Sequence, residues 1–507
     1  MIDSKQYLLS RKPWGKTGFR HFALPGGFVL SCHEALQVRM TSDRETVLLG
    51  HAWSCVESDG LSPLDAAAQC RTPEETESLV AHWAGRWLLV RAGRLYLDAC
   101  GLLGCFFAQG ACSSSLSLLV RHLGQRSVRP CLEHGFGMDY FPGPLTPRKG
   151  IRRLLPGQGL RLSDGFVFPR PVFDSPPPAS DDRRTEMVLA LFDTLLRRFS
   201  ADWHGPILLA LTAGYDSRTL LSLLVRAGVD FETFTLDHAA IRRGDLELPP
   251  QLAAVVGRPH RLVFRSGPSD RRRFRDFDFH SAGMSADEDR NFYAWRQYPE
   301  SSAGPRTAVL RAGVWEAVRH YYSTLKTKSG WTFRRFDDPS EFSAAYLNVR
   351  YRPLMRQSLE EWMEWQRDKP SPADPADLFY IVQRAGCWLS SVEQGLDIVD
   401  GMDSLQLCNC RTILSVLAGY PAERRIRGGH QEQIIRAACP ALLQFPFQGN
   451  PSRAHPVPAS PSGRVSAWAT GTKGLAAVLA RKRQTARTYL RCLGLRGTIR
   501  LLLDERK

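Results

Sequence analysis

Residues 206–217 read PILLALTAGYDS, and this stretch decides which fold the chain can adopt. Its first half, residues 206–211, is a continuous apolar run, which is typical of a parallel strand buried on both faces of a sheet. Its second half contains small residues and leads into the helical run SRTLLSLLVRAG, which ends at Gly228. A buried strand, a tight turn and a helix in this order predict the first unit of an α/β domain.

The segments around this unit repeat the alternation of strand and helix. FETFTLD (residues 231–237) and RPHRLVF (residues 258–264) predict two further strands, with the helix ELPPQLAAVVG between them. Upstream, residues 184–199 carry apolar side chains at helical spacing and predict another helix. The pattern predicts a doubly wound parallel sheet, and the chain from there to about residue 440 reads as mainly helical.

Residues 1–167 read as a separate β-rich domain of short apolar runs that Gly, Asp and Ser turns divide. RWLLVRAGRLYLD (residues 86–98) predicts a hairpin, and residues 73–83 predict a helix capped by Thr72. The Pro-rich stretch 168–182 predicts a linker to the α/β domain, which we expect to span 183–445. Residues 446–507 read as a Pro-rich segment and a basic amphipathic tail.

Composition excludes several classes of protein and leaves the partner open. The chain has 507 residues, 43% of them hydrophobic, which excludes a disordered chain or a fibre. Its formal net charge of +16 favours acidic partners such as nucleic acid, an anionic membrane or phosphate-bearing ligands. Twelve scattered cysteines without zinc-finger spacing predict free thiols in a reducing compartment. Because no signal-like start and no membrane-spanning apolar run occur, we expect a cytoplasmic protein.

Two basic segments invite a functional interpretation. Residues 270–280, DRRRFRDFDFH, interleave Arg with Phe as single-stranded nucleic-acid sites do, but a solvated loop is the more frequent case. No recognition motif of a nucleic-acid-binding fold occurs, so nucleic acid is not an expected partner. In the tail, Arg483, Arg487 and Arg491 share one helical face, which fits peripheral contact with an anionic membrane or packing on the body.

The turn between the first strand and its helix carries the residues that suggest chemistry. Ligands of open α/β sheets bind at the carboxyl ends of strands, and small residues such as Ala213 and Gly214 let backbone N–H groups approach an anion. The following helix N-terminus adds favourable partial positive charge. Thr212 and Ser217 offer hydroxyls to phosphate oxygens, and Asp216 is a hard oxygen ligand suited to Mg²⁺. A plain capped turn is the alternative.

This turn resembles the pyrophosphate loop of the asparagine synthetase family, usually Ser-Gly-Gly-x-Asp-Ser. The loop reads TAGYDS here, so that Thr keeps the hydroxyl and an Ala replaces one Gly. The resemblance implies an ATP-pyrophosphatase domain whose loop holds the pyrophosphate and whose second strand ends at the adenosine. The residues that it assigns to nucleotide binding are Thr212, Ala213, Gly214, Tyr215, Asp216, Ser217, Leu236 and Gly313.

Residues 310–316, LRAGVWE, are similar to the family's second acidic loop. That loop usually carries an Asp-Glu pair whose Asp helps to hold Mg²⁺. Here Trp315 replaces this Asp, and only Glu316 remains. The resemblance therefore implies Asp216 and Glu316 as the metal ligands and as catalytic residues.

The catalytic Lys of the family is also replaced, because HQEQIIR carries Glu432 at that position. Such a Lys stabilises negative charge during adenylation and acyl transfer. Three interpretations stay open: another cation substitutes, the chemistry differs, or the protein is inactive. The candidate substitutes, each of which could equally be an ordinary surface residue, are Arg425, Arg427 and His430.

The N-terminal domain resembles the glutaminase half of class B asparagine synthetases, for example in KGIRRLLPGQGLRLSDG (residues 149–165). The resemblance implies the αββα layers of Ntn hydrolases. A glutaminase needs Cys at position 2, and Ile2 stands there. We therefore expect a retained scaffold, as in relatives that make β-lactams or lasso-peptide macrolactams with an amine already present in the substrate.

Together these features predict an ATP-dependent, carboxylate-activating synthetase that forms an amide bond through an acyl-adenylate, with ATP and Mg²⁺ bound. Two substrate types stay open: a small or saccharide-linked acid, and a peptide that is closed into a macrolactam. A catalytically impaired scaffold is the alternative, and the replacements at Trp315 and Glu432 favour it. A nucleic-acid-modifying enzyme of the same superfamily is a third reading.

Overall fold

The structure is a computed structural model of the chain. It describes residues 3–57, 60–108, 110–125, 140–237, 241–264, 306–324, 352–369, 371–397 and 401–447. Ile2, the basic segment 270–280 and the tail from residue 448 onward lie outside these ranges, so the expectations for them stay predictions. Residues 448–507 contain twelve Lys and Arg against two acidic residues, so most of the charge excess lies outside the described residues.

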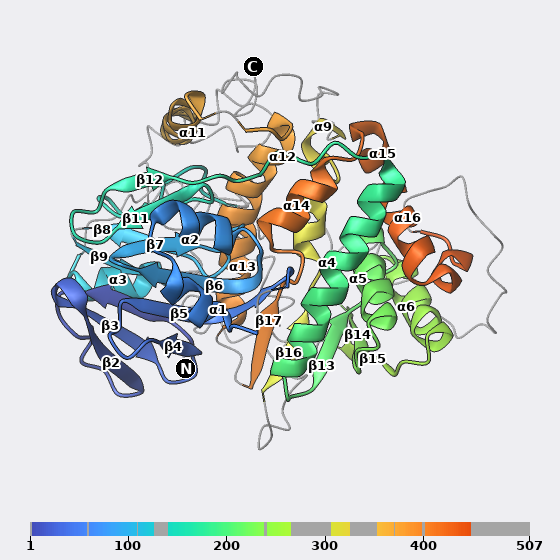
Figure 1. The fold of residues 1–507 in the computed structure, drawn as a ribbon, viewed down its shortest axis with the longest axis horizontal. Coiled ribbons are helices and arrows are strands. Elements are labelled where there is room, and N and C mark those ends of the chain that lie inside the picture. The colour runs from blue at the N-terminus through green and yellow to red at the C-terminus, as the bar shows by residue number, and fades with distance from the viewer. Residues whose placement is uncertain are drawn as a thin grey trace, which may run out of the picture.

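A five-stranded sheet in which every pair of neighbours is parallel forms the centre of the α/β domain. The strand order is β15-β14-β13-β16-β17, and β13 (Ile207–Ala210) is the middle strand. The chain runs outward from β13 to β15 and then crosses to β16 on the other side of β13 (Figure 1). The other strands are β14 (Glu232–Asp237), β15 (His260–Phe264), β16 (Thr307–Leu310) and β17 (Met402–Leu405).

Both faces of β13 are buried, as its apolar run predicts. Leu209 belongs to the large core that α4 (Asp181–Asp202) and α5 (Tyr215–Arg226) share. Its neighbour Leu208 points to the opposite face and packs with Phe234 and with Leu396 of α13 (Ser390–Leu396). Because successive side chains of a strand alternate between faces, only an uninterrupted apolar run fills both cores.

Helix α6 (Arg243–Val255) packs against β14 and β15. The remaining helical segments of the described α/β domain are η4 (Gly313–Val318), α9 (Tyr321–Thr324), α11 (Arg352–Arg367), α12 (Pro375–Phe379), η6 (Tyr380–Leu389), α13 (Ser390–Leu396), α14 (Arg411–Ala418), α15 (Ala422–Ile426), α16 (Gly429–Ala438) and η7 (Pro440–Gln444).

The N-terminal part consists of two six-stranded antiparallel sheets that face each other across an apolar core. Helix α3 (Leu116–His122) packs on the outer face of the first sheet, and α1 (Pro63–Gln69) and α2 (Pro73–Val80) belong to the second sheet's side. The first sheet has the order β10-β8-β9-β1-β3-β2 and the second has the order β12-β11-β7-β6-β5-β4. Assignment of this arrangement to the Ntn hydrolases stays a prediction.

The strands of the first sheet are β1 (Tyr7–Ser10), β2 (Phe19–Leu24), β3 (Phe28–His33), β8 (Phe106–Ala108), β9 (Ala111–Ser113) and β10 (Arg152–Arg153), and η1 (Pro25–Gly27) is the turn between β2 and β3. The strands of the second sheet are β4 (Val38–Met40), β5 (Thr46–Ser54), β6 (Trp83–Arg91), β7 (Arg94–Leu97), β11 (Gln158–Arg161) and β12 (Val167–Pro169). The final strand ends two residues beyond the domain boundary that the sequence predicts.

Most local expectations for the chain agree with these elements. The mixed α/β class with a parallel sheet is confirmed, and the hairpin of residues 86–98 pairs Leu88 with Leu97 as β6 and β7. The side chain of Thr72 caps α2 by accepting the N–H of Glu75 at 3.1 Å. The helix is shorter than predicted and ends at Val80, because β6 begins three residues later.

The described residues after position 264 are mainly helical, as the sequence predicts, but they also supply two strands that the sequence analysis did not predict, β16 and β17. Their apolar runs are four residues each, too short for periodicity to distinguish a strand from a buried helical turn. Pairing with β13 decides the matter, since β16 lies beside it in parallel register.

The two halves of the chain meet in a buried polar junction. The guanidinium of Arg86 on β6 forms a bidentate ion pair with Asp397, at 2.6 and 2.7 Å. Asn409 donates to Asp98 of the N-terminal part at 2.8 Å. Lys5 lies 3.6 Å from Asp403 of β17, the edge strand of the α/β sheet. The large apolar core also includes residues of both halves, so the junction resembles the inside of one domain.

Ten cysteines lie in the described residues, and all are free thiols. Among those residues no group of three or more His, Cys, Asp or Glu is placed to hold a metal ion. None of the helices within the described ranges has an apolar stretch long enough to span a bilayer.

We expect Arg86→Ala to lower the free energy of unfolding by about 3 kcal/mol, because it leaves the Asp397 carboxylate buried without its partner. Urea denaturation, followed by circular dichroism, measures this loss. Arg183→Ala is the matched control, since the ion pair of Arg183 with Glu186 is exposed and contributes about 0.5 kcal/mol or less. Equal losses in the two variants would contradict a structural role for the junction.

Candidate functional site

The candidate site lies where the order of strands reverses. From β13 the chain proceeds to β14 on one side, whereas β16 lies on the other side. The connections that leave the carboxyl ends of β13 and β16 therefore turn away from each other and border a crevice, the usual ligand position of open α/β sheets. Residues 211–214 follow β13, and Arg311 and Ala312 follow β16.

The loop after β13, which we call the anion loop (Thr212–Ser217), is closed by hydrogen bonds between its ends. Ser217 Oγ accepts the N–H of Thr212 at 3.0 Å and lies 2.9 Å from Thr212 Oγ1. Gly214 is the N-cap residue of α5, with an extended backbone and no side chain to shield the first N–H groups of the helix. Thr212 is exposed, so the mouth of the loop is open to a ligand.

Two side chains from outside hold the Ala213 peptide of the anion loop. The N–H of Ala213 donates to Asp245 Oδ1 at 2.9 Å, so a carboxylate of α6 already occupies one backbone donor. The carbonyl of Ala213 accepts from the buried Arg218 at 3.0 Å. Arg218 also donates to the carbonyls of Phe445 and Pro446, at 2.8 and 2.9 Å, and so ties the loop to the chain after η7.

Tyr215 fixes the loop from the side of α16. Its ring stacks on Phe447 with the ring centroids 3.9 Å apart, and its hydroxyl donates to Glu432 Oε1 at 3.2 Å. Gly428 lies so close that a Cβ there would stand 2.7 Å from the Tyr215 ring, and its φ of +72° also favours glycine. Glu432, at the position where the family has its Lys, therefore serves as an acceptor for the loop.

Asp216 projects from the first turn of α5 and has a partner at each oxygen. Oδ1 accepts from Gln431 at 2.8 Å, and Oδ2 forms an ion pair with Arg319 at 3.3 Å. The guanidinium of Arg319 also lies 5.5 Å from the centre of the Tyr215 ring. With one donor at each oxygen, one of them a cation, the Asp216 side chain is held in a fixed direction.

Glu316 approaches from the loop after β16, in the middle of η4. Its Oε2 accepts from the hydroxyl of Tyr380 at 2.6 Å. Burial raises the pKa of the Glu316 carboxyl, and the negative charge of Asp216 raises it further. Two carboxylates from the two loops at the reversal point thus act on each other.

The donor chemistry of this pair fits a magnesium ion. Mg²⁺ in nucleotide sites is usually held by one or two carboxylates together with phosphate oxygens and waters. Asp216 and Glu316 supply two such carboxylates, and a divalent cation would relieve the like-charge contact that raises the pKa of Glu316.

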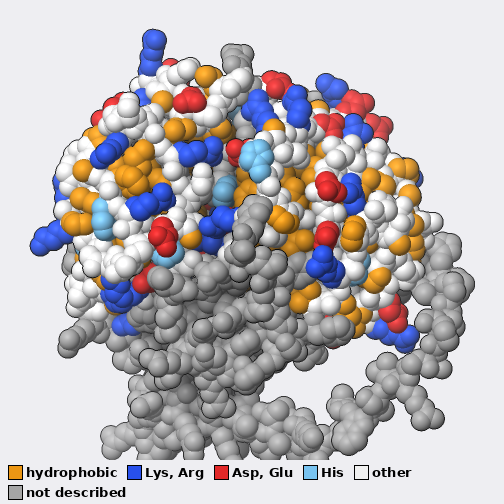
Figure 2. All heavy atoms as spheres, turned by 90° about the horizontal axis from the view of Figure 1, so that it is seen from below, with side chains coloured by type: hydrophobic (Ala, Val, Ile, Leu, Met, Phe, Trp, Pro, Cys, Tyr) orange, Lys and Arg blue, Asp and Glu red, His pale blue; other side chains and the backbone are white. Residues whose placement is uncertain are grey.

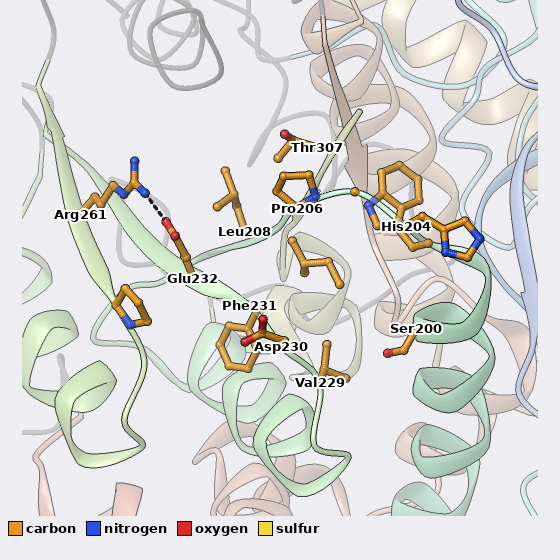
Figure 3. Close-up of a pocket in the computed structure, with 14 residues that line it drawn as sticks. Ser200, His204, Pro206, Leu208, Val229, Asp230, Phe231, Glu232, Arg261 and Thr307 are labelled. Carbon is orange, nitrogen blue, oxygen red and sulfur yellow. Dashed lines mark ion pairs between the residues drawn. The ribbon is translucent and has the colours of Figure 1, made fainter. Parts of the chain in front are cut away.

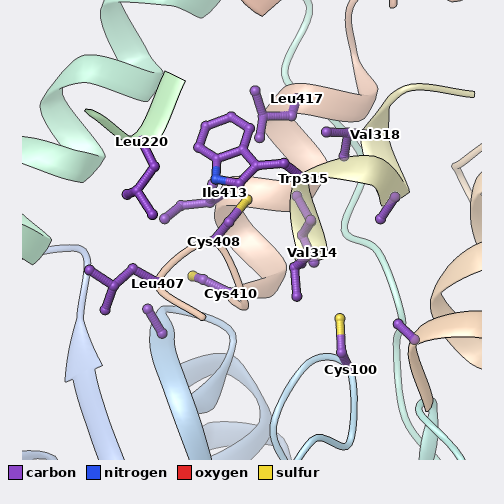
Figure 4. Packing of buried hydrophobic residues seen from close by; sticks show 14 of the residues in the cluster. Cys100, Leu220, Val314, Trp315, Val318, Leu407, Cys408, Cys410, Ile413 and Leu417 are labelled. Atoms are coloured by element: carbon purple, nitrogen blue, oxygen red, sulfur yellow. The ribbon is translucent and has the colours of Figure 1, made fainter. Parts of the chain in front are cut away.

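Trp315 is the reason that the second loop offers one carboxylate and not two. Its side chain is fully buried and stacks on Phe192 of α4, with the ring centroids 5.6 Å apart. Figure 4 shows the indole among Leu220, Ile413 and other apolar side chains, directed into the core. Trp315, where the resemblance implies an Asp ligand, therefore contributes to core packing. Glu316 is the acidic residue of this loop that faces the site.

The three candidate substitutes for the family's Lys differ in burial and in partners. His430 is wrong for this role, because its ring is completely buried and burial, followed by Arg425 and Arg319, lowers its pKa to about 3. Arg425 is also wrong, since it is buried in an ion pair with Asp377 at 2.6 Å. Arg427 is exposed between α15 and α16, forms no ion pair with another described residue, and stays a prediction.

Arg319 is the cation that sequence reasoning missed. It follows Glu316 by one helical turn in WEAVRHYY, where nothing marks it as different from a surface Arg. Only the packing of η4 against α5 brings it to Asp216.

The two remaining nucleotide-binding expectations concern Leu236 and Gly313. Leu236 lies near the carboxyl end of β14 and is partly buried, next to the end of β13. Gly313 opens η4, and a Cβ there would stand 3.3 Å from both Gln406 and Leu389. Both residues lie at the carboxyl edge of the sheet, and their contact with a nucleotide stays a prediction.

A cavity of about 600 Å³ lies at the opposite edge of the same sheet. Figure 3 shows its lining at the starts of strands, with Glu232 and Arg261 paired on one side and His204 on the other. Figure 2 shows the molecule from below, where basic and acidic side chains lie scattered among apolar ones over the coloured part of the surface. The cavity is therefore separate from the anion loop and contains none of the predicted site residues.

No family model and no curated protein matches the sequence. Among solved structures, the chain is similar to an NMN synthetase from Francisella tularensis, with 12% identity and a TM-score of 0.20, over 49% of this chain and 97% of the other. It is also similar to a glutamine-dependent NAD+ synthetase from Acinetobacter baumannii in complex with ADP, with 15% identity and a TM-score of 0.21. That likeness covers 51% of this chain and 48% of the other. TM-scores of this size carry no inference about the activity of this chain.

We expect Trp315→Asp to destabilise the fold by about 4 kcal/mol or more, because it places a carboxylate in the apolar core and leaves a cavity. Thermal unfolding measures the loss, and Trp315→Phe is the matched control, with a smaller effect. A Trp315→Asp protein that is as stable as the wild type and binds Mg²⁺·ATP more tightly would contradict the structural role of Trp315.

We expect the loss of Mg²⁺·ATP affinity on acidification to begin at a higher pH than protonation of an ordinary Glu would give, because burial and the charge of Asp216 raise the pKa of Glu316. Calorimetric titration between about pH 5 and pH 8 compares the wild type with Glu316→Gln, which cannot titrate. The titration of ATP itself is common to both proteins, so the ratio of their dissociation constants isolates Glu316. A ratio that does not change with pH would show that this carboxyl does not act on the ligand.

Proposed function

We propose that this chain is an ATP-dependent, carboxylate-activating enzyme that forms an amide bond, of the asparagine synthetase-like type. The observation that carries the proposal is the position of Asp216 and Glu316 on the two loops that border the crevice between β13 and β16. An anion loop at a helix N-terminus and two facing carboxylates are the elements that a magnesium-nucleotide site requires.

In this proposal the anion loop binds the β- and γ-phosphates of ATP. The donors would be the first N–H groups of α5 and the exposed hydroxyl of Thr212, with Ser217 Oγ, 2.9 Å away, holding that hydroxyl in place. Asp216 and Glu316 would hold Mg²⁺, which neutralises phosphate charge when bound. The adenosine would lie toward the end of β14, near Leu236.

The chemistry is a nucleotidyl transfer followed by an acyl transfer. One oxygen of the acid substrate attacks the α-phosphorus, and the bond from that phosphorus to the bridging oxygen breaks to release pyrophosphate. The resulting acyl-adenylate is then attacked at its carbonyl carbon by an amine, which loses a proton as AMP leaves and the amide forms. The protein contributes positioning and stabilisation of the developing charge.

Arg319 is the residue that we propose in place of the family's Lys. It carries a permanent positive charge, lies 3.3 Å from Asp216 and is partly exposed to the site. With Asp216 as a ligand of Mg²⁺, the guanidinium of Arg319 would be free to bind phosphate oxygens. This role would leave Glu432 to support Tyr215 and not to act in the reaction.

The acid and the amine stay open within the proposal. A small or saccharide-linked acid is one substrate type, and a peptide that is closed into a macrolactam is the other. In both cases we expect the amine to come from the substrate and not from glutamine.

Specific contacts favour a second candidate, a nucleotide-binding scaffold without turnover. Both oxygens of Asp216 and the N–H of Ala213 have protein partners, so ATP must displace Arg319 and Asp245 from them. Such a scaffold would bind ATP weakly and would not cleave it.

We expect ATP–pyrophosphate exchange in the presence of the correct acid, and we expect Asp216→Ala to abolish it, because the variant loses a metal ligand and the fixed position of Arg319. Exchange of radiolabelled pyrophosphate into ATP over a panel of small, saccharide-linked and peptide acids measures the activity. Asp230→Ala is the matched control, since Asp230 is almost fully exposed at the amino end of β14 and should leave exchange unchanged.

The result separates the two candidates. Exchange that Asp216→Ala abolishes and Asp230→Ala retains supports the enzyme. ATP binding without exchange, over the whole panel, supports the scaffold. Absence of ATP binding at millimolar concentration would contradict both.

A further inference from the structure

Arg384 lies in η6, a π-helical segment of ten residues that packs against η4. Helices of this kind are rare, and they occur frequently at functional sites. The same segment carries Tyr380, whose hydroxyl holds Glu316 at 2.6 Å. Arg384 therefore stands on the element that supports one of the two site carboxylates.

The guanidinium of Arg384 has aromatic neighbours and no acidic partner among the described residues. It lies 4.2 Å from the ring centre of Trp388 and 5.5 Å from that of Tyr321. Its Nε is buried without a hydrogen bond, and its guanidinium forms no ion pair within the described part of the chain. The residue is partly exposed, so the group is accessible from one side.

This state contrasts with that of several buried arginines in the described part of the chain. Arg86 is paired with Asp397, Arg425 with Asp377, and Arg411 with Glu77. Arg153 and Arg218 have no such ion pair, but each donates to backbone carbonyls. A guanidinium that is partly removed from water costs free energy unless an anion or several hydrogen bonds compensate it. Aromatic rings supply only a part of that compensation.

Electrostatics keep Arg384 charged next to the candidate site. Burial would lower its pKa, but Tyr380, Tyr322, Tyr321 and Glu316 raise it more, so that the group stays a cation. The positive charges of Arg384 and Arg319 both lower the pKa of Glu316, against the larger effects of burial and Asp216 that raise it. Only Arg319 also contacts Asp216 of the anion loop.

We propose that Arg384 is the receptor for an oxyanion of the ligand, and specifically for the carboxylate of the acid substrate. The planar guanidinium offers a bidentate fork that matches a carboxylate, and the rings of Trp388 and Tyr321 hold it in place. A phosphate oxygen of ATP has the same chemistry, but the anion loop lies beside Arg319, whereas Arg384 is on the η6 side of Glu316. This inference rests on the proposed function, because it names where that enzyme binds its acid.

The first arm of the test measures exchange kinetics in the full-length protein. We expect Arg384→Ala to raise the KM for the acid by about 10- to 100-fold, the effect of one lost charge-assisted pair, with the KM for ATP unchanged. Arg384→Lys should recover a part of the loss. Arg367→Ala is the matched control, because Arg367 is an exposed side chain of α11. An unchanged KM for the acid, or a raised KM for ATP instead, overturns the proposal.

The second arm needs no turnover and keeps the inference distinct from the proposed function. Phenylglyoxal modifies accessible guanidinium groups, and peptide mass spectrometry of the wild-type protein locates the adducts. We expect glutarate at millimolar concentration to protect Arg384 and to leave Arg367 unprotected. If no acid supports exchange but glutarate still protects Arg384, the proposed function fails and the carboxylate receptor stands. Protection by ATP alone, or by neither compound, overturns the receptor whether or not exchange occurs.

Discussion

The parallel pairing of β13 with β16 is the constraint on which the rest of the site depends. Because β14 lies on the other side of β13, the loops after β13 and β16 diverge and leave their first residues facing a shared crevice. This arrangement brings Asp216 and Glu316 together although 100 positions separate them in the sequence. The raised pKa of Glu316 is the electrostatic consequence of that proximity and of burial.

Charge compensation around this pair explains many of the contacts nearby. Arg319 and Gln431 bind Asp216, Tyr380 binds Glu316, and a carboxylate of α6 binds a backbone donor of the anion loop. Each contact satisfies a polar group that would otherwise be buried or unpaired. A magnesium-nucleotide that binds here would replace some of these contacts, such as the ion pair between Arg319 and Asp216, with contacts to the metal ion and the phosphates.

Sequence patterns predicted much of the local structure and only a part of the site. The buried run of β13, the loop that follows it and the helix α5 were accessible because apolar periodicity and turn residues are local signals. Trp315 and Glu316 were recognised as a departure from an acidic pair, but their opposite directions, one into the core and one into the site, follow from the packing of η4. His430 was one of three candidate cations in the sequence, and its burial could not be read there because it arises from α16 packing on α5.

The sequence by itself determined the α/β class, the anion loop and the candidate carboxylates, because hydrophobic period, small residues and side-chain chemistry are properties of short segments. Only the tertiary structure decided which cation serves Asp216, and that Arg384 has aromatic neighbours and no acidic partner among the described residues. Arg319, Arg425 and Arg384 are chemically identical in the sequence. Their environments differ because the partners come from other parts of the chain. Arg319 pairs with Asp216, Arg425 pairs with the buried Asp377, and Arg384 lies over the rings of Tyr321 and Trp388.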